Sequence, residues 1–291
     1  MQTTQVMTSD WRQWLNHNLA NGCSAGSMVD AMVAAGIQAE TARQWLGDVK
    51  AVTGESSGQN TAAMARGVAG SYRYETPRLP VAGNMIKTND RDVRVTMRLA
   101  QPVAAIFDDI LSHEECDELI RLSSLKLQRS TIVDAQTGEL REIDARSSYG
   151  TFFALNETAF IARLDRRIAE VMHMPAENGE GLQILNYKVG GEYKTHFDFF
   201  PPEDPGSAVH LAKGGQRVST LVIYLNDVER GGETIFPNAH MSVIAKKGSA
   251  VYFEYYNSLG QVDPQSLHGG TPVELGEKWI ATKWMRQARY G

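Results

Sequence analysis

The chain has 291 residues, 42% of them hydrophobic and 22% charged, which is the composition of an ordinary globular protein. Its formal net charge of −5 argues against a nucleic-acid partner, because such proteins carry a basic surface. Two cysteines, no apolar leader and no apolar run of ~20 residues exclude a disulfide framework and a membrane span, so we expect a cytoplasmic protein.

The N-terminal part of the chain predicts a small helical module. Apolar residues recur at helical spacing within residues 8–47, and Asn21-Gly22 and Ala35-Gly36 are typical helix stops. Residues 51–80 are rich in small residues and end in prolines, which favours a linker. We therefore expect a module over 1–50, a linker over 51–80 and a main domain over 81–291. Packing or dimerisation is the simpler role for the module; binding of a substrate or partner is the alternative, and the oligomeric state stays open.

The main domain begins with helices and continues as a series of short strands. Residues 93–99 alternate like a strand, Ser112 to Glu115 form a capping box that opens a helix, and 157–173 carry one apolar helical face. Gly-rich turns then separate expected strands near 182–189, 192–199, 217–225, 233–236, 241–245, 249–256, 265–273 and 278–286. This order predicts a mainly β fold with flanking helices, namely two sheets in a jelly roll.

Two histidines and one aspartate form a candidate metal site. A strand places residues i and i+2 on one face, so His196 and Asp198 point the same way. His268 lies within a later strand and is the favoured third ligand, whereas His210 and His240 lie in turns or loops. Two histidines and a carboxylate can hold one face of a ferrous ion, although hydrolytic zinc sites use the same ligands.

Lys278 separates these two interpretations. It follows His268 by ten residues and shares a strand face with Thr282, Trp284 and Arg286. A cation and a hydroxyl on one inward face suit a carboxylate held by a charge-assisted hydrogen bond. The alternative is that the lysine reaches solvent at the strand edge. A buried Lys278 favours an iron enzyme whose co-substrate is a dicarboxylate, 2-oxoglutarate.

At these residues the sequence resembles the prolyl 4-hydroxylase family of iron(II)- and 2-oxoglutarate-dependent dioxygenases. The resemblance covers residues 100–287, and three motifs occur in order. Residues 187–198 resemble the family pattern Y-x-x-G-x-x-Y-x-x-H-x-D, residues 217–237 resemble R-x-x-T-x-x-x-Y-L-x-D-V followed by G-G-E-T-x-F-P, and residues 276–284 resemble G-x-K-W-x-A-T-K-W.

The resemblance implies a double-stranded β-helix with iron(II) at His196, Asp198 and His268. It implies 2-oxoglutarate held by Lys278, Thr282 and Tyr187, with O2 as second co-substrate, succinate and CO2 as products, and L-ascorbate as a reductant. The implied substrate is a prolyl residue in a peptide or protein, contacted by Tyr193, Arg217, Trp284, Arg146 and Arg286. The last of these departs from the family, since many peptidyl hydroxylases have a histidine there, and this departure concerns the substrate rather than the chemistry.

Two long loops, 130–146 and 199–215, are expected to close over the substrate. Their length favours a peptide over the alternative substrate, a free amino acid or other small molecule. A non-catalytic 2-oxoglutarate- or oxygen-sensing module is a third interpretation, which the complete set of three ligands disfavours. A halogenase usually lacks the carboxylate ligand, so Asp198 argues against that activity.

Overall fold

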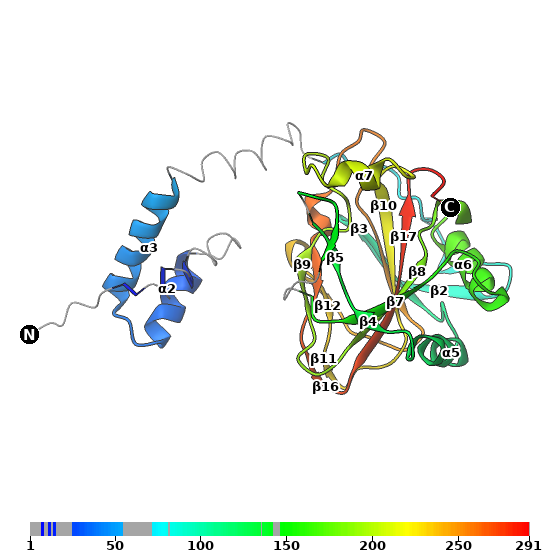
Figure 1. Cartoon of the computed structure of the whole chain (residues 1–291), viewed down its shortest axis with the longest axis horizontal. Coiled ribbons are helices and arrows are strands. Elements are labelled where there is room, and N and C mark those ends of the chain that lie inside the picture. Colours follow the sequence, from blue (N-terminus) through cyan, green and yellow to red (C-terminus); the bar gives the residue numbers. More distant parts are fainter. Residues whose placement is uncertain are drawn as a thin grey trace, which may run out of the picture. The chain divides into compact units, whose positions relative to one another are not determined.

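The computed structural model describes residues 7–8, 11–12, 14–15, 25–54, 72–80, 82–134, 136–141 and 146–290 (Figure 1). Contacts divide the chain into two compact units, Met1–Ser71 and Tyr72–Gly291. Among the described residues, no helix has the length and apolar character needed to cross a membrane.

The first unit contains the predicted helices. Helix α2 spans Ala25–Ala34 and α3 spans Ala39–Gly54, and their buried side chains, among them Met32 and Trp45, form a small apolar core. The predicted stop after α2 is confirmed, because Gly36 adopts a positive φ of 89° there. The other predicted stop, Asn21-Gly22, lies outside the described residues. Helix α3 continues past residue 50, where we expected the linker to begin, and ends at Gly54.

The second unit is built on a nine-stranded antiparallel sheet. Strand β17 lies in its middle, between β10 and β8. In sheet order the strands are β1 (Met85–Lys87), β2 (Asp92–Ala100), β3 (Val103–Asp108), β14 (Ala250–Glu254), β10 (Arg217–Tyr224), β17 (Lys278–Arg286), β8 (Leu182–Tyr187), β7 (Tyr149–Phe153) and β4 (Gln128–Arg129).

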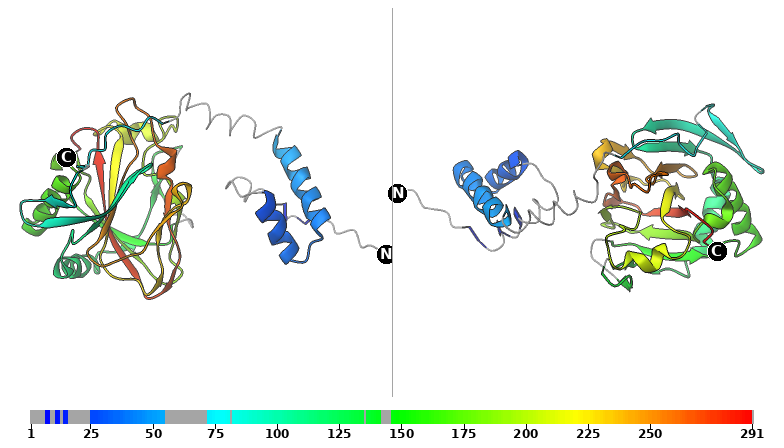
Figure 2. Two further views of the ribbon diagram at one scale, coloured as in Figure 1. Left: turned by 180° about the vertical axis from the view of Figure 1, so that it is seen from behind. Right: turned by 90° about the horizontal axis from the view of Figure 1, so that it is seen from above.

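A smaller four-stranded sheet faces the large one and completes the jelly roll (Figures 1 and 2). Its order is β13 (Met241–Val243), β12 (Thr234–Phe236), β15 (His268–Gly270) and β9 (Tyr193–His196). Two further ribbons pair β11 (Arg230–Gly231) with β16 (Val273–Leu275), and β5 (Ile132–Val133) with β6 (Leu140–Arg141). The predicted jelly-roll class is confirmed.

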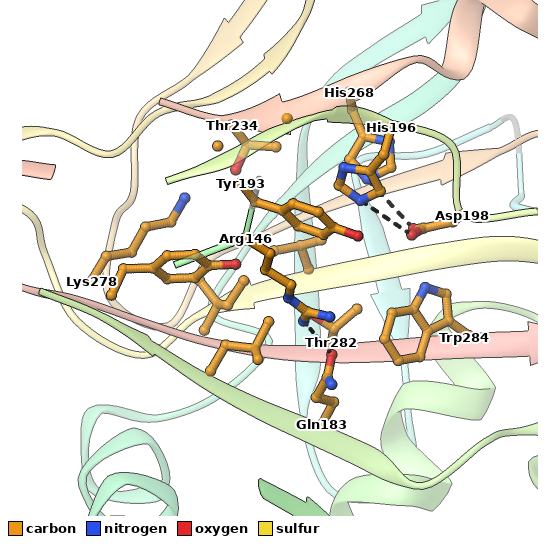
Figure 3. A pocket seen from close by; sticks show the side chains of 16 residues that line it. Arg146, Gln183, Tyr193, His196, Asp198, Thr234, His268, Lys278, Thr282 and Trp284 are labelled. Carbon is orange, nitrogen blue, oxygen red and sulfur yellow. Dashed lines mark hydrogen bonds and ion pairs between the residues drawn. The ribbon is translucent and has the colours of Figure 1, made fainter. Parts of the chain in front are cut away.

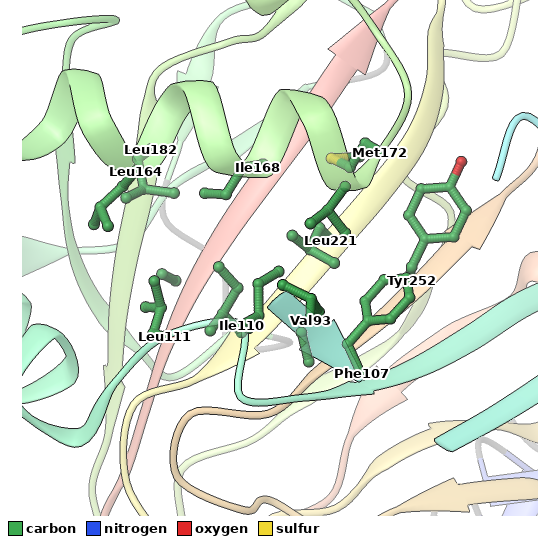
Figure 4. Close-up of a cluster of buried hydrophobic side chains, with 14 of the residues drawn as sticks. Val93, Phe107, Ile110, Leu111, Leu164, Ile168, Met172, Leu182, Leu221 and Tyr252 are labelled. Atoms are coloured by element: carbon green, nitrogen blue, oxygen red, sulfur yellow. The ribbon is translucent and has the colours of Figure 1, made fainter. Parts of the chain in front are cut away.

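Two helices cover the outer face of the large sheet. Helix α5 spans His113–Ser123 and begins at the predicted capping box; α6 spans Ala159–Val171. Figure 4 shows Leu164 and Ile168 of α6 lying over Leu221 of β10 in one buried cluster. The inner faces of the same strands carry a second apolar cluster, which includes Tyr224 and Phe253, between the two sheets. Both faces of the central strands are therefore buried, and the inner face opens into a cavity.

The sequence-based boundaries differ from the structure at two further places. Residues 72–80, which we expected in the linker, belong to the second unit, where Arg78 forms an ion pair with Glu254 at 2.9 Å. The single strand expected over 265–273 is a 3-10 turn, Pro264–Ser266, followed by β15, because Asp263 caps that turn through the backbone N–H of Gln265.

Candidate active site

The two candidate histidine ligands lie side by side on paired strands. In the antiparallel register of β9 and β15, His268 is directly opposite His196, and Asp198 follows two residues after β9 ends. Oδ1 of Asp198 is 3.6 Å from Nε2 of His196, and Oδ2 of Asp198 is 3.5 Å from Nε2 of His268 (Figure 3). All three potential ligand atoms lie within 4.8 Å of one another. The predicted set of three therefore converges on one point.

Backbone carbonyls fix the orientation of both imidazole rings. Nδ1 of His196 is 2.9 Å from the carbonyl oxygen of Lys194, and Nδ1 of His268 is 3.0 Å from that of Ser266. A ring nitrogen facing a carbonyl must carry the proton, so Nε2 is left with a free lone pair, as in metal-ligating histidines. Burial lowers the pKa of His268 to about 4, although the nearby Asp198 opposes this shift. The low pKa keeps this imidazole neutral.

Asp198 is ionised although it is only 7% exposed. Burial by itself would raise the pKa of this carboxyl, but His268, His196 and Arg217 outweigh it and hold the pKa well below its usual range. One carboxylate and two imidazole ligands suit a divalent cation. The competing histidines lie elsewhere: His210 contacts the carbonyl oxygen of Gly138, and His240 caps a 3-10 turn.

An inner cavity extends from the three ligands to Lys278. In Figure 3, Lys278 lies at one end of it, and Asp198 and Trp284 lie at the other. The predicted co-substrate residues Thr282 and Tyr187 both line it, together with apolar side chains that exclude water: Leu185, Val222 and Ile280. The cavity thus has a metal-binding end and a cationic end.

The ammonium group of Lys278 has no acidic partner in the described parts of the chain. Its side chain is only 4% exposed, no carboxylate oxygen lies within 4.0 Å, and it faces the rings of Tyr187 and Tyr224 at 5.8 Å. Burial lowers the pKa of Lys278 to about 8, with Glu233 partly opposing it. A buried, unpaired cation is costly, and a ligand carboxylate would remove that cost. The residues present therefore fit a dicarboxylate reaching from the metal to this lysine.

Thr234 and Gln183 also line the inner cavity, and sequence reasoning missed both. Tyr224 donates its hydroxyl proton to Oγ1 of Thr234 at 2.8 Å, which leaves the hydroxyl proton of Thr234 free to point at a ligand. Thr234 is the last residue of the Gly-Gly-Glu-Thr stretch, so the motif already marked it as a candidate site residue. Its face could not be assigned without the register of β12.

An outer cavity adjoins the metal end and carries two hydrogen-bond donors without acceptors. The predicted substrate residues Arg146, Tyr193, Arg217 and Trp284 all line it. Arg146 donates to the carbonyl oxygen of Thr131 and to Gln183 and lies over the ring of Tyr193 at 4.7 Å. Its Nε and the indole Nε1 of Trp284 are buried without a partner. Such donors need an acceptor from elsewhere.

Arg286 lies behind the cavity wall, which corrects its predicted role as a substrate contact. Its side chain is 1% exposed and borders neither cavity. It donates to Glu180 at 2.7 Å and to the carbonyl oxygens of His210 and Gly215 at 3.1 and 2.6 Å. Because Glu180 and the 199–215 segment absorb its donors, Arg286 anchors the loop instead of facing a ligand.

Glu180 also connects Arg286 with Arg217. Arg217 donates to both carboxylate oxygens of Glu180 at 2.6 and 2.9 Å, and to the backbone carbonyl of Asp198 at 3.2 Å. Its guanidinium stacks on Trp284 at 3.9 Å. Despite burial, the two arginines hold the pKa of Glu180 below its usual range, so the cluster is ionised. Sequence reasoning missed Glu180, which has no motif of its own.

The two predicted loops meet beside the outer cavity. Strands β5 and β6 form a hairpin in the first loop, and α7 (Ser207–Leu211) lies in the second. Nε2 of His210 is 2.9 Å from the carbonyl oxygen of Gly138. A Cβ on Gly138 would come within 2.7 Å of the carbonyl oxygen of Gly206, so the close approach requires glycine. Both loops contribute to the cavity wall, through Ile132 and Ser207 among others.

The jelly roll, the three converging ligands and the cationic inner cavity define a 2-oxoglutarate- and iron(II)-dependent dioxygenase. The model of the 2OG-Fe(II) oxygenase superfamily matches residues 182–286, which span all three ligands and Lys278. The chain belongs, within these oxygenases, to the prolyl 4-hydroxylase family, as its relatives show.

Two of these relatives are plant proteins from Arabidopsis thaliana. Probable prolyl 4-hydroxylase 3 is 38% identical over 209 residues, covering 65% of this chain and 71% of the relative. Prolyl 4-hydroxylase 1 is 42% identical over 201 residues, covering 64% and 69%. A solved structure, the viral collagen prolyl hydroxylase of Paramecium bursaria Chlorella virus-1 in complex with 2-oxoglutarate, has a TM-score of 0.50 at 29% identity and covers 63% of this chain and 95% of that one.

Proposed function

We propose that this enzyme hydroxylates prolyl residues of a peptide or protein at the 4-position, with iron(II) held by His196, Asp198 and His268. When bound, iron and 2-oxoglutarate activate O2 for hydroxylation, with release of succinate and CO2. The observation that supports the site is a single cavity with three converging ligands at one end and the unpaired ammonium of Lys278 at the other.

We assign the binding of 2-oxoglutarate to Lys278, Thr282 and Tyr187, and add Thr234. Lys278 meets the far carboxylate, and the hydroxyl groups of the other three residues donate to its oxygens. The apolar side chains between the two ends keep water from the reacting atoms. This chain's residues thus bind and orient the co-substrate while the iron supplies the redox chemistry.

The outer cavity supports a peptide as the substrate. The two orphaned donors, Nε of Arg146 and Nε1 of Trp284, match the carbonyl oxygens of a peptide backbone. A prolyl residue presents a carbonyl and no N–H, so a wall that offers donors is complementary to it. Tyr193 and Arg217 also line this cavity.

A free amino acid is the second candidate substrate. One observation favours it: the contact between His210 and Gly138 closes the two loops against each other beside the cavity. A peptide would require this contact to open, whereas a small molecule fits beneath it. An experiment that offers both substrates to the enzyme separates the two candidates.

The test is incubation of the enzyme with iron(II), 2-oxoglutarate and either proline-containing peptides or free L-proline, read by mass spectrometry. We expect one added oxygen atom on the peptide, and 4-hydroxyproline after acid hydrolysis. Oxygen added to the free amino acid and to no peptide would overturn the peptide assignment. An equal yield from enzyme stripped of iron by a chelator would overturn the iron assignment.

Two accompanying properties belong to the same proposal. We propose that L-ascorbate restores the iron after turnover without substrate; the family resemblance supports it, and a longer linear phase of succinate release with ascorbate tests it. We also propose a cytoplasmic location, which the free, buried thiol of Cys116 and the scarcity of cysteine support. Fractionation of cells that express the untagged protein tests the location.

A further inference from the structure

Two buried hydroxyl groups stand behind the carboxylate of Asp198. Oγ1 of Thr220, on β10, donates to Oδ2 of Asp198 at 2.7 Å. The phenol oxygen of Tyr255 lies 2.9 Å from the same Oγ1. Both side chains are 0% exposed, and neither borders the inner or the outer cavity. They therefore touch neither co-substrate nor substrate, and any role in the reaction must act through Asp198.

The direction of both hydrogen bonds follows from counting protons. An ionised carboxylate can only accept hydrogen bonds, so Thr220 donates its single hydroxyl proton to Asp198. Thr220 can then only accept from Tyr255, whose hydroxyl proton has no other acceptor in the described part of the chain. The hydrogen bonds therefore run in one direction, from Tyr255 to Thr220 to Asp198, and they end on Oδ2 of the Asp198 carboxylate.

The hydrogen-bonded series is anchored by the large sheet, because Thr220 lies within β10 and Tyr255 follows directly after β14, where its backbone N–H donates to the carbonyl oxygen of Val218 at 3.1 Å. Thr220 is paired with Phe253 of β14 on one side and with Trp284 of β17 on the other. Arg217 holds the backbone carbonyl of Asp198 from the same strand. The carboxylate is therefore fixed at its backbone and at Oδ2, and only Oδ1 has no hydrogen-bond donor among the described residues.

We propose that Thr220, supported by Tyr255, is a positioning residue that makes Asp198 bind the iron through Oδ1 alone. A metal with six positions, three of them filled by protein, keeps three for a chelating 2-oxoglutarate and for O2. A carboxylate that bound through both oxygens would take one of these three positions. A hydrogen bond to Oδ2 opposes that mode, so the threonine protects the position that the co-substrates need.

This inference rests on the proposed metal site, and its test distinguishes the two. Co(II) serves as the probe, because its visible absorption reports coordination number and geometry without turnover. The variants are Thr220→Val, which keeps the shape and loses the hydroxyl; Thr220→Ser, which keeps the hydroxyl; and Tyr255→Phe. For each we measure Co(II) affinity by competition with a chelator, the Co(II) spectrum, 2-oxoglutarate affinity of the Co(II)-loaded protein, and thermal unfolding of the metal-free protein.

We expect Thr220→Val to lose about tenfold or more in Co(II) affinity, the usual effect of removing a hydrogen bond to a metal ligand. Its Co(II) spectrum should change and its 2-oxoglutarate affinity should fall, while Thr220→Ser restores all three. Tyr255→Phe should change them in the same direction by less, and it carries the test alone if Thr220→Val does not fold.

Three outcomes would overturn the inference. The first is Thr220→Val, or Tyr255→Phe in its place, with an unchanged Co(II) spectrum and unchanged affinities. The second is a lower unfolding temperature as the only effect, which would mean that the hydroxyl groups serve packing. The third is a Thr220→Ser variant that folds and still binds like Thr220→Val. If the wild-type protein itself binds no Co(II), it is the proposed metal site that fails.

Discussion

Replacing Lys278 by methionine should weaken 2-oxoglutarate binding while leaving the metal ligands in place. The change removes the ammonium group that, among the described residues, alone borders the inner cavity, and it keeps nearly the same volume. A hydrogen bond to a charged group contributes about 2 kcal/mol, so the concentration of 2-oxoglutarate needed for half-maximal rate should rise roughly 30-fold. Co(II) affinity should be unchanged.

The same substitution should stabilise the protein in the absence of co-substrate. A lysine whose pKa falls from 10.5 to about 8 on burial carries a penalty of about 3 kcal/mol at neutral pH. Between pH 8 and 10.5 the unfolded chain binds this proton more tightly than the folded one, so wild-type stability should rise with pH through that window. The penalty is fully present below pH 8, and Lys278→Met should remove it.

The assays are succinate release against 2-oxoglutarate concentration, and urea unfolding of the metal-free protein at several pH values. Lys188→Met is the matched control, because Lys188 is exposed and forms an ion pair with Glu277 at the surface. Wild-type 2-oxoglutarate affinity should fall above pH 8 as the free ammonium loses its proton. A Lys278→Met enzyme with the wild-type requirement for 2-oxoglutarate and no gain in stability would refute the reasoning.

Three further predictions concern other parts of the fold. Asp198→Ala should abolish 2-oxoglutarate turnover with an unchanged circular dichroism spectrum, and retained turnover would contradict the metal assignment. Arg286→His should raise the KM for peptide with little change in Co(II) affinity, because the lost contacts hold the carbonyls of His210 and Gly215; an unchanged KM would show that the loop needs no anchor. Arg167→Ala should lower the free energy of unfolding by roughly 3 kcal/mol in urea, because it leaves Glu115 and Asp90 without their buried partner; a loss below that of a surface substitution would disprove this.

Local patterns in the sequence pointed to the metal ligands and to Lys278. His196 and Asp198 were expected to point the same way as residues i and i+2 of one strand, although β9 ends at His196, and His268 was favoured because it precedes Lys278 by ten residues. The same alternation placed Lys278, Thr282 and Trp284 on one inward face, as found. Lys278, Thr282 and Trp284 could be predicted together because they lie on a single strand, whereas the meeting of His196 with His268 depends on the pairing of β9 with β15.

The residues that were missed depend on pairing between distant parts of the chain. Thr220 reaches Asp198 across 22 residues of sequence, and Arg286 reaches Glu180 across 106. Alternation correctly placed Arg286 on the inward face of β17, but it could not show that α7 and Glu180 cover that end. The last residues of the expected linker were assigned wrongly for the same reason, since Arg78 meets Glu254 only in the folded sheet.

Strand β17 is buried at all nine positions, and its two faces serve different tasks. Lys278, Thr282 and Trp284 face the reaction, while Lys283 pairs with Asp165 of α6 at 2.7 Å on the opposite side. A substitution on one face therefore alters chemistry, and one on the other alters packing, with no neutral position between. New substrates are consequently easier to acquire through the hairpin and α7, which can vary in length without disturbing this strand. Sequence changes at the mouth of the outer cavity can therefore alter the substrate, while the burial of β17 keeps the residues of the reaction in place.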